Sequence, residues 1–349
     1  MINLSSWVRL GGQVEVLSFY VALVSNILLI YLIIRYSTRD LGTYKYIMLT
    51  FCGNSILFAW SSAYCKIAYF SQGTQLVLFY FLETVGLSRW IAIELGGIYV
   101  SSYCAVITLL ALHYVHRYCS ICRPKWKKFV EGKYLLGCYG VLMVFTIEWW
   151  FAVRHLQIAT EETDNGMRNL FYEAYNRTIE EVVYMGPYYY IRNEKGERQY
   201  RWLSMLGSLI MIKILVICYC VVFYCGLSIY SKIKTLSNHV SESKAGIKKN
   251  RHQKQLFNAL LVQTAIPVVF LYMPISICFT LPFFEIGIVP IATVSPLSLA
   301  VFPAIDPWAI IFLVRDYRTA LFKNLKIPIQ RSSVMYPTVP VTGPGTIVT

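Results

Sequence analysis

An acidic residue stands between two prolines inside the last apolar stretch of the chain. Residues 302–308 read FPAIDPW, so Asp306 lies between Pro303 and Pro307. A carboxylate is costly inside a bilayer, and prolines remove backbone donors and bend the helix around it. A functional role is therefore the default hypothesis for Asp306.

Two asparagines lie at a depth similar to that of Asp306. Counted back from the predicted cytoplasmic ends at 1.5 Å per residue, Asn26, Asn54 and Asp306 each lie roughly 10 to 12 Å deep. Polar groups in lipid must be satisfied by one another or by water, so the three predict one intramembrane polar cluster. The cluster is either a static connection between helices or a switch that repacks on activation, and the sequence leaves both open.

Other charges inside apolar stretches are few. Lys213 and Glu148 are able to pair or to extend separately toward water, and a transporter would be expected to use more titratable steps than these two. Metal-ligand spacing and a nucleophile beside a base are both missing from the sequence. The sequence therefore predicts no enzyme, no metal site and no cofactor.

Composition places the chain in the bilayer. It is 56% hydrophobic and 14% charged, with a mean hydropathy of +0.52, which is far more apolar than a soluble domain of 349 residues. The net charge of +14 comes from Lys and Arg in short loops between apolar stretches, which argues against nucleic acid as a partner. We expect a multi-pass membrane protein.

Seven stretches have the length and composition of membrane spans, at about 14–34, 46–66, 93–115, 134–153, 202–230, 256–279 and 286–314. Between the second and third, residues 75–90 are expected to form an outer connection, as a loop or an interfacial helix. The predicted fold is an all-α seven-transmembrane helix bundle over 1–326. It ends in a short amphipathic helix at 315–326, and 327–349 form a disordered cytoplasmic tail.

The distribution of basic residues predicts the orientation. Of the 32 Lys and Arg residues, 21 lie in the loops after spans one, three and five or in the C-terminal segment. Basic residues are held on the cytoplasmic side, so we expect the N-terminus outside and the C-terminus inside.

The longest outer loop, residues 154–201, carries three expectations. Asn176-Arg177-Thr178 is an acceptor pattern for N-glycosylation, which is used only on the outer side. No cysteine in the loop is available to tether it to the third helix. Its tyrosines are able to form a lid or an interfacial belt, and we favour the belt; they are Tyr184, Tyr188, Tyr189 and Tyr190.

Prolines mark the expected hinges. Pro267 and Pro274 bend the sixth span, whose basic cytoplasmic end includes Lys249 and Arg251. A swing of that end opens a crevice for a partner. The alternative interpretation is that these prolines have no functional role, because prolines are common in membrane helices.

The motifs resemble a known receptor family. They are His116-Arg117-Tyr118 at the end of the third span, residues 255–274 with QLFNAL, QTAIP and YMP, and PAIDP at 303–307 followed by RDYR at 315–318. They resemble the nematode seven-transmembrane serpentine chemoreceptors of the Str class, in the rhodopsin-like superfamily, over nearly the whole chain. This resemblance implies an odorant or pheromone receptor of the sensory cilium that signals through a heterotrimeric G protein.

The resemblance also assigns roles. Residues 116–118 look like the acid-Arg-aromatic triplet of rhodopsin-like receptors, with His116 in place of the acid, so an ion pair holding Arg117 is not expected. Asp306-Pro307 looks like the Asn-Pro motif of the seventh helix, but Ile310 stands where a tyrosine would be.

The predicted function is that of a receptor in the plasma membrane that binds a small neutral ligand in the outer half of the bundle and activates a G protein. Alternatives are an odorant-gated ion channel of inverted topology and a small-molecule transporter. The oligomeric state is open. Candidate lining residues, which packing explains equally well, are Tyr99, Ser102, Tyr103, Met205, Tyr272 and Met273.

Overall fold

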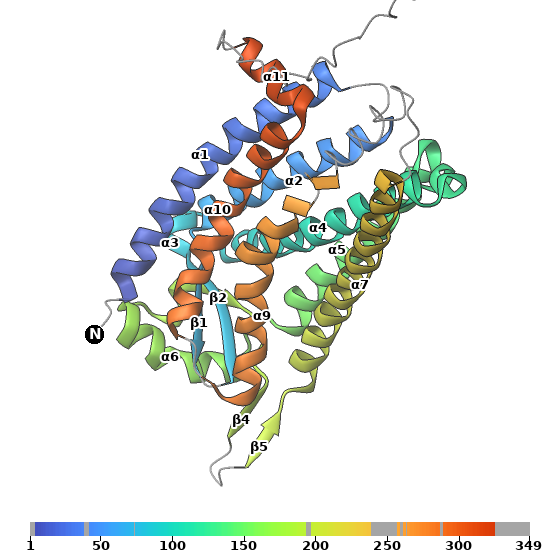
Figure 1. The fold of residues 1–349 in the computed structure, drawn as a ribbon. Coiled ribbons are helices and arrows are strands. Elements are labelled where there is room, and N and C mark those ends of the chain that lie inside the picture. The colour runs from blue at the N-terminus through green and yellow to red at the C-terminus, as the bar shows by residue number, and fades with distance from the viewer. Residues whose placement is uncertain are drawn as a thin grey trace, which may run out of the picture.

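The computed structural model describes residues 4–37, 42–72, 74–192, 197–238, 257–258, 261–262, 264–286 and 289–324. Lys249, Arg251 and the predicted tail at 327–349 lie outside these ranges. Figure 1 places the N-terminus, the strands and α6 at one end of a helical bundle, and α11 at the other end.

Within the described residues, seven long helices form the bundle: α1 (Leu4–Tyr36), α2 (Tyr44–Cys65), α4 (Arg89–Ile121), α5 (Leu135–Phe151), α7 (Trp202–Asn238), a sixth at Thr264–Phe284, and α10 (Val289–Leu313). Six of them are long and apolar enough to cross a membrane. The seventh, α2, carries Asn54 and three serines, which lower its hydropathy. The predicted seven-helix fold is confirmed.

The central helix is α4, which packs against α2, α5 and α7, while α1 packs against α2 and α10. Nearly every residue of α4 from Tyr99 to Cys119 is buried, so its apolar surface is continuous rather than confined to one face. Two 3-10 segments, Pro124–Val130 and Gly132–Tyr134, connect α4 to α5. After α10, the short amphipathic helix α11 (Arg315–Asn324) follows as predicted.

A three-stranded antiparallel sheet, here called the roof, covers one end of the bundle. Its strands are β1 (Ala68–Gln72), β2 (Gln75–Phe81) and β3 (Val182–Met185), with β2 in the middle. The segment 75–90 is therefore neither loop nor interfacial helix at its start: it forms β2, and the helical turn α3 (Leu82–Val85) follows.

Both faces of the roof are buried. Successive side chains of a strand point to opposite faces. Phe79 and Tyr184 face α6 (Glu161–Tyr175) and pack on Phe171, whereas Leu78 and Met185 face the bundle. The roof is thus a layer between α6 and the transmembrane helices.

The loop tyrosines belong to this layered end. Tyr184 is in β3, and Tyr190 begins the hairpin of β4 (Tyr190–Arg192) and β5 (Arg198–Tyr200). Tyr184, Tyr189 and Tyr190 are at most 5% exposed, and Tyr188 is half-buried. The favoured interfacial belt is wrong, because strand pairing with β2 holds this loop against the bundle as a lid.

Candidate functional site

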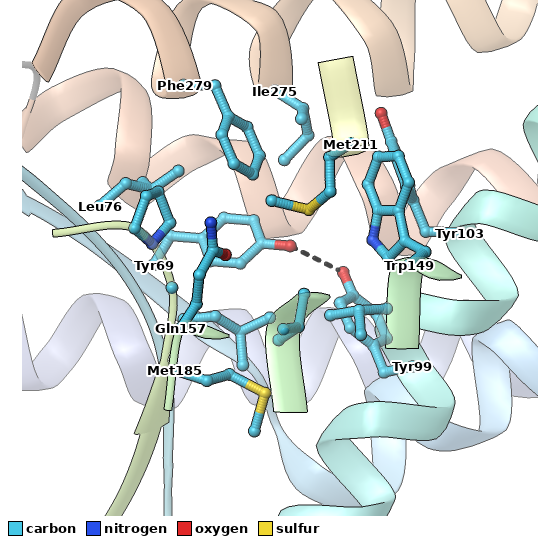
Figure 2. A pocket seen from close by; sticks show the side chains of 15 residues that line it. Tyr69, Leu76, Tyr99, Tyr103, Trp149, Gln157, Met185, Met211, Ile275 and Phe279 are labelled. Atoms are coloured by element: carbon cyan, nitrogen blue, oxygen red, sulfur yellow. Dashed lines mark hydrogen bonds between the residues drawn. The ribbon is translucent and has the colours of Figure 1, made fainter. Parts of the chain in front are cut away.

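A small cavity of about 60 Å³ lies under the roof, between the sheet and the helices. Figure 2 shows its walls converging from α4, α5, α7, α9 (Met273–Thr280) and the strands. Fifteen residues line it: Tyr69, Leu76, Leu78, Tyr99, Val100, Tyr103, Trp149, Val153, Gln157, Met185, Gly186, Pro187, Met211, Ile275 and Phe279. In another protein, an engineered apolar cavity of about 150 Å³ holds one benzene molecule. The smaller cavity here therefore accepts a ligand of few atoms unless its walls move.

The cavity wall is uncharged. None of the fifteen lining residues is Asp, Glu, Lys, Arg or His. Its polar side-chain groups are three phenols, one amide and the indole N–H of Trp149, and two of the phenols pair with each other, since Tyr69 Oη lies 3.2 Å from Tyr99 Oη. Such a wall suits a neutral ligand with few polar atoms.

Two of the six candidate lining residues are in the wall, namely Tyr99 and Tyr103. The other four are elsewhere: Ser102 is buried with its carbonyl toward α2, Tyr272 packs at a tilt against Tyr219, Met273 is 58% exposed, and Met205 is half-buried outside the cavity. Spacing along the helices did not show which of the six candidates face the cavity. For Met273 the reason is the π-helical turn before α9, which rotates this side chain outward.

Gln157 is a lining residue that the sequence did not single out. It is 4% exposed and follows α5 directly after a π-helical turn at Ala152–Leu156. Its Nε2 donates to the Ser204 carbonyl at 3.2 Å and to Ser208 Oγ at 2.9 Å. A glutamine just beyond a span carries no pattern that marks it as part of a pocket, since its partners lie about fifty residues away.

An ion pair joins the long loop to the end of α4 nearer the roof, where the sequence offers no cysteine in the loop for a disulfide tether. Arg154 Nε donates to Glu94 Oε1 at 2.8 Å, and both side chains are partly exposed. Each of the ten cysteines of the chain is a free thiol. The tether is thus electrostatic, with strand pairing beside it.

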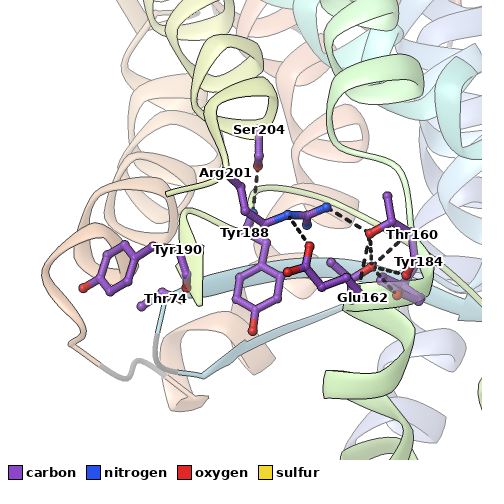
Figure 3. A network of polar contacts seen from close by, with 9 residues as sticks. Thr74, Thr160, Glu162, Tyr184, Tyr188, Tyr190, Arg201 and Ser204 are labelled. Atoms are coloured by element: carbon purple, nitrogen blue, oxygen red, sulfur yellow. Dashed lines mark hydrogen bonds and ion pairs between the residues drawn. The ribbon is translucent and has the colours of Figure 1, made fainter. Parts of the chain in front are cut away.

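A polar network around Arg201 joins the lid to α7 (Figure 3). Arg201 Nη2 donates to Thr160 Oγ1 at 2.9 Å, and its Nε lies 3.6 Å from Glu162 Oε2. The Tyr188 amide donates to Ser204 Oγ at 2.9 Å. Burial raises the pKa of Tyr189 to about 12, so this phenol stays neutral and donates to the Phe279 carbonyl at 2.9 Å.

Asn26 of α1 donates a hydrogen bond to a backbone carbonyl of α10 that lacks its helical partner. Pro307 has no N–H, so the Pro303 carbonyl one turn earlier lacks its helical donor. Asn26 Nδ2 donates to that carbonyl at 3.0 Å, across from α1 to α10. Asn26 is 1% exposed, and the same nitrogen also bonds the Ala22 carbonyl at 2.8 Å.

The other two members of the predicted polar cluster lie on neighbouring helices. Asp306 is 1% exposed on α10. Asn54 Nδ2 donates to the Ser102 carbonyl of α4 at 3.0 Å. Asn26 thus bonds backbone carbonyls of α1 and α10, and Asn54 bonds a backbone carbonyl of α4.

The predicted hinge prolines flank irregular helix. Pro267 immediately precedes a π-helical turn at Val268–Tyr272, and Pro274 is in the first turn of α9. π-Turns are wider than α-helix and often mark functional positions. The two cavity residues Ile275 and Phe279 lie just beyond this turn.

At the opposite end of the bundle, Arg117 is buried under an aromatic ring. It is 5% exposed, and its guanidinium carbon lies 3.9 Å from the ring centre of Tyr44. Tyr44 Oη is 2.9 Å from His113 Nδ1, and His116 Nε2 lies 3.7 Å from Glu131 Oε1. Tyr118 packs on Tyr224 of α7.

Two further residues from the sequence have clear positions. Lys213 Nζ donates to Glu148 Oε2 at 2.6 Å, so this pair forms. Asn176 is exposed and ends α6 with a left-handed φ of 53°, a conformation that asparagine tolerates.

Seven helices around a roofed cavity define the class of protein: a rhodopsin-like bundle. The crystal structure of squid rhodopsin has the same fold, with a TM-score of 0.56 and 12% identity over 93% of this chain and 87% of that one. Within this class, the family model described as serpentine type 7TM GPCR chemoreceptor Str matches residues 12–322. The chain belongs to that family, which is a receptor family rather than an enzyme family.

Nematode receptors are similar over almost their whole length. Serpentine receptor class r-10 of Caenorhabditis elegans is 29% identical over 328 residues, 91% of this chain and 92% of that protein. G-protein coupled receptor str-33 of the same species is 25% identical over 89% of this chain and 90% of that one. The chain is thus a multi-pass membrane protein of a chemoreceptor type.

Proposed function

We propose that the protein is a chemosensory receptor of the plasma membrane, in a sensory cilium, that binds a small neutral ligand and activates a heterotrimeric G protein. In this proposal the N-terminus and the roof face outward and α11 faces the cytoplasm. The observation that carries it is the uncharged cavity under the roof, enclosed by four helices and the sheet. Family membership and the rhodopsin-like fold support the receptor role.

The ligand acts through the bent sixth helix. Ile275 and Phe279 line the cavity, one or two turns beyond the π-turn that Pro267 and Pro274 flank. A ligand that packs better against one position of α9 shifts the population toward that position. The wide turn then lets the cytoplasmic part of the helix swing, which opens the crevice for the G protein.

The cytoplasmic switch is Arg117 with its neighbours His116 and Tyr118. In the resting state the Tyr44 ring covers the guanidinium, which takes the place of the ion pair that the missing acid would form. Activation moves Arg117 out to the G protein. In the sequence, Lys249 and Arg251 precede the sixth span, and in this proposal they add positive charge for the G protein.

The polar cluster of Asn26, Asn54 and Asp306 acts near the hinge of α10. Pro303 and Pro307 weaken that helix, and Asn26 restores one of its lost bonds. We assign Asn26 to holding α10 against α1 during the swing, while Asn54 joins α2 to α4 beside them.

Expression with a responsive G protein and a panel of volatile compounds tests the proposal. We expect an active compound to raise the G-protein signal in intact cells, and Arg117→Ala to remove the signal while surface expression and ligand binding remain. An active compound that signals fully through Arg117→Ala would contradict the role of Arg117. Ion current without G protein would contradict the receptor mechanism.

A further inference from the structure

Two buried polar atoms in the cavity wall have no hydrogen-bond partner among the described residues. They are Gln157 Oε1 and Tyr103 Oη, and their side chains are 4% and 5% exposed. Buried polar atoms are almost always bonded, so each unbonded one in a native cavity calls for a partner. Figure 2 shows the Gln157 amide pointing in among the lining side chains.

The hydrogen bonds of Gln157 fix which amide atom is left without a partner. The Ser204 carbonyl is only an acceptor, so the amide atom 3.2 Å from it is the nitrogen. The nitrogen also bonds Ser208 Oγ at 2.9 Å. The free atom is therefore the oxygen, which accepts hydrogen bonds and never donates them.

The backbone holds Gln157 in this position. Its carbonyl accepts from the Gly186 amide at 3.0 Å. Gly186 has a φ of +142°, and a Cβ there would lie 2.3 Å from the Leu76 carbonyl oxygen, so only glycine fits. Gln157 is thus anchored to the roof and to α7, and its free oxygen is preorganised.

We propose that the cavity selects a short-chain alcohol, and that Gln157 Oε1 is the specificity-determining acceptor of its hydroxyl proton. This inference rests on the ligand pocket of the proposed function and names its ligand class. An amine cation or a carboxylate is disfavoured, because no charged residue lines the cavity. A ketone, aldehyde or ether has an oxygen that only accepts hydrogen bonds. Such a ligand would place a second acceptor beside Gln157 Oε1 and leave Oε1 without a hydrogen-bond donor.

The remaining wall sets the size of the alcohol. The cavity of about 60 Å³ is lined mainly by Leu, Val, Ile and aromatic side chains, which favour a short alkyl group. Met185 and Met211 are flexible side chains that yield a little more space. Tyr103 Oη is the other unbonded polar atom of the wall, and a phenol is able to donate as well as accept a hydrogen bond.

The test compares isomers that differ only in donor ability. The full-length receptor in lipid nanodiscs is titrated with 1-butanol and with methyl propyl ether, which have the same formula, and saturable binding is followed by tryptophan fluorescence. Trp149 lies in the wall, and Trp149→Phe identifies its share of the signal. We expect 1-butanol to bind at least about tenfold more tightly than the ether.

Substitutions then locate the preference. Gln157→Met keeps an unbranched side chain and is expected to reduce the alcohol-to-ether ratio to about one. The control is Thr146→Val, which removes a hydroxyl bond to the Leu142 carbonyl of α5 outside the cavity wall, so the ratio should stay near about tenfold. A general loss of fold would weaken binding of both isomers in either variant, whereas loss of the acceptor oxygen alone changes the ratio.

The outcomes separate this inference from the proposed function. Equal binding of the isomers to the wild-type receptor overturns the alcohol assignment alone. If neither isomer nor a three- to five-carbon alcohol series binds saturably, both the assignment and the ligand pocket fail. Selective alcohol binding without G-protein activation supports the assignment and counts against the proposed signalling.

Discussion

The guanidinium of Arg117 lies under the ring of Tyr44, with 3.9 Å between its central carbon and the ring centre. The two residues come from the cytoplasmic ends of α4 and α2 in the proposed orientation. A buried cation over an aromatic face is attracted by the ring quadrupole, at about 2 kcal/mol when desolvated. In the proposed function this contact takes the place of the pair between Arg117 and an acid at position 116, where His116 provides no carboxylate.

Loss of the Tyr44 ring is expected to activate the receptor without ligand. An interaction of about 2 kcal/mol that exists only in the resting state corresponds to up to about thirtyfold in the ratio of the two states. Tyr44→Leu should therefore raise basal G-protein activity several-fold. Tyr44→Phe keeps the ring and loses only the hydroxyl contact with His113, so it should raise basal activity much less.

The matched control is Tyr46→Leu, on the same helix, where the tyrosine is 49% exposed. It should leave basal activity at the wild-type level at equal surface expression. Equal basal activity in Tyr44→Leu and wild type would show that the ring does not hold Arg117.

The interhelical bond of Asn26 predicts a double-mutant cycle. Asn26→Ala removes the donor to the Pro303 carbonyl and should lower the free energy of unfolding by about 1 kcal/mol. Pro307→Ala restores the helical N–H that this carbonyl lacks. In that background Asn26→Ala should cost clearly less, as measured by thermal unfolding of purified receptor in detergent.

Additive effects in the cycle would contradict this explanation, because two independent changes do not couple. Asn54→Ala is the comparison, since Asn54 bonds α4 rather than α10. Its effect should be the same with and without Pro307→Ala.

Sequence reasoning found the helices and the depth of the polar residues, because both follow from hydropathy and from a constant rise per residue. It therefore placed Asn26 and Asp306 on helices that do lie together. It missed the roof, since strands buried on both faces read as continuous apolar segments without alternation. Residues 75–81, for example, are QLVLFYF, which fits a buried helix or an interfacial segment equally well.

The cavity was only partly predictable for a related reason. Tyr99 and Tyr103 lie one turn apart on the half of α4 nearer the roof, so spacing identified them. Gln157 lies in the wall because of bonds to Ser204 and Ser208, and such distant pairings leave no trace in local sequence. The outward turn of Met273 depends on the π-turn before it, which shifts the helical phase.

The ion pair between Glu94 and Arg154 predicts salt-sensitive attachment of the lid. The side chains are 31% and 20% exposed, so the pair should contribute about 0.5 to 1 kcal/mol. Arg154→Met is expected to loosen residues 154–160, seen as faster hydrogen exchange. The reversed pair, Glu94→Arg with Arg154→Glu, should restore protection at low salt, and no recovery would indicate that packing rather than charge holds this segment.

Asn176 gives a direct test of the orientation. It is exposed at the end of α6, followed by Arg177 and Thr178, so an outward-facing loop should carry an N-glycan there. Thr178→Ala removes the acceptor pattern but leaves the helix cap of Asn176 intact, whereas Thr178→Ser keeps both. We expect glycosidase treatment to shift the wild type and Thr178→Ser on a gel but not Thr178→Ala, and a C-terminal tag to be detected only after permeabilisation. An unglycosylated protein whose C-terminal tag is accessible on intact cells would mean that the bundle has the inverted orientation expected of the channel alternative.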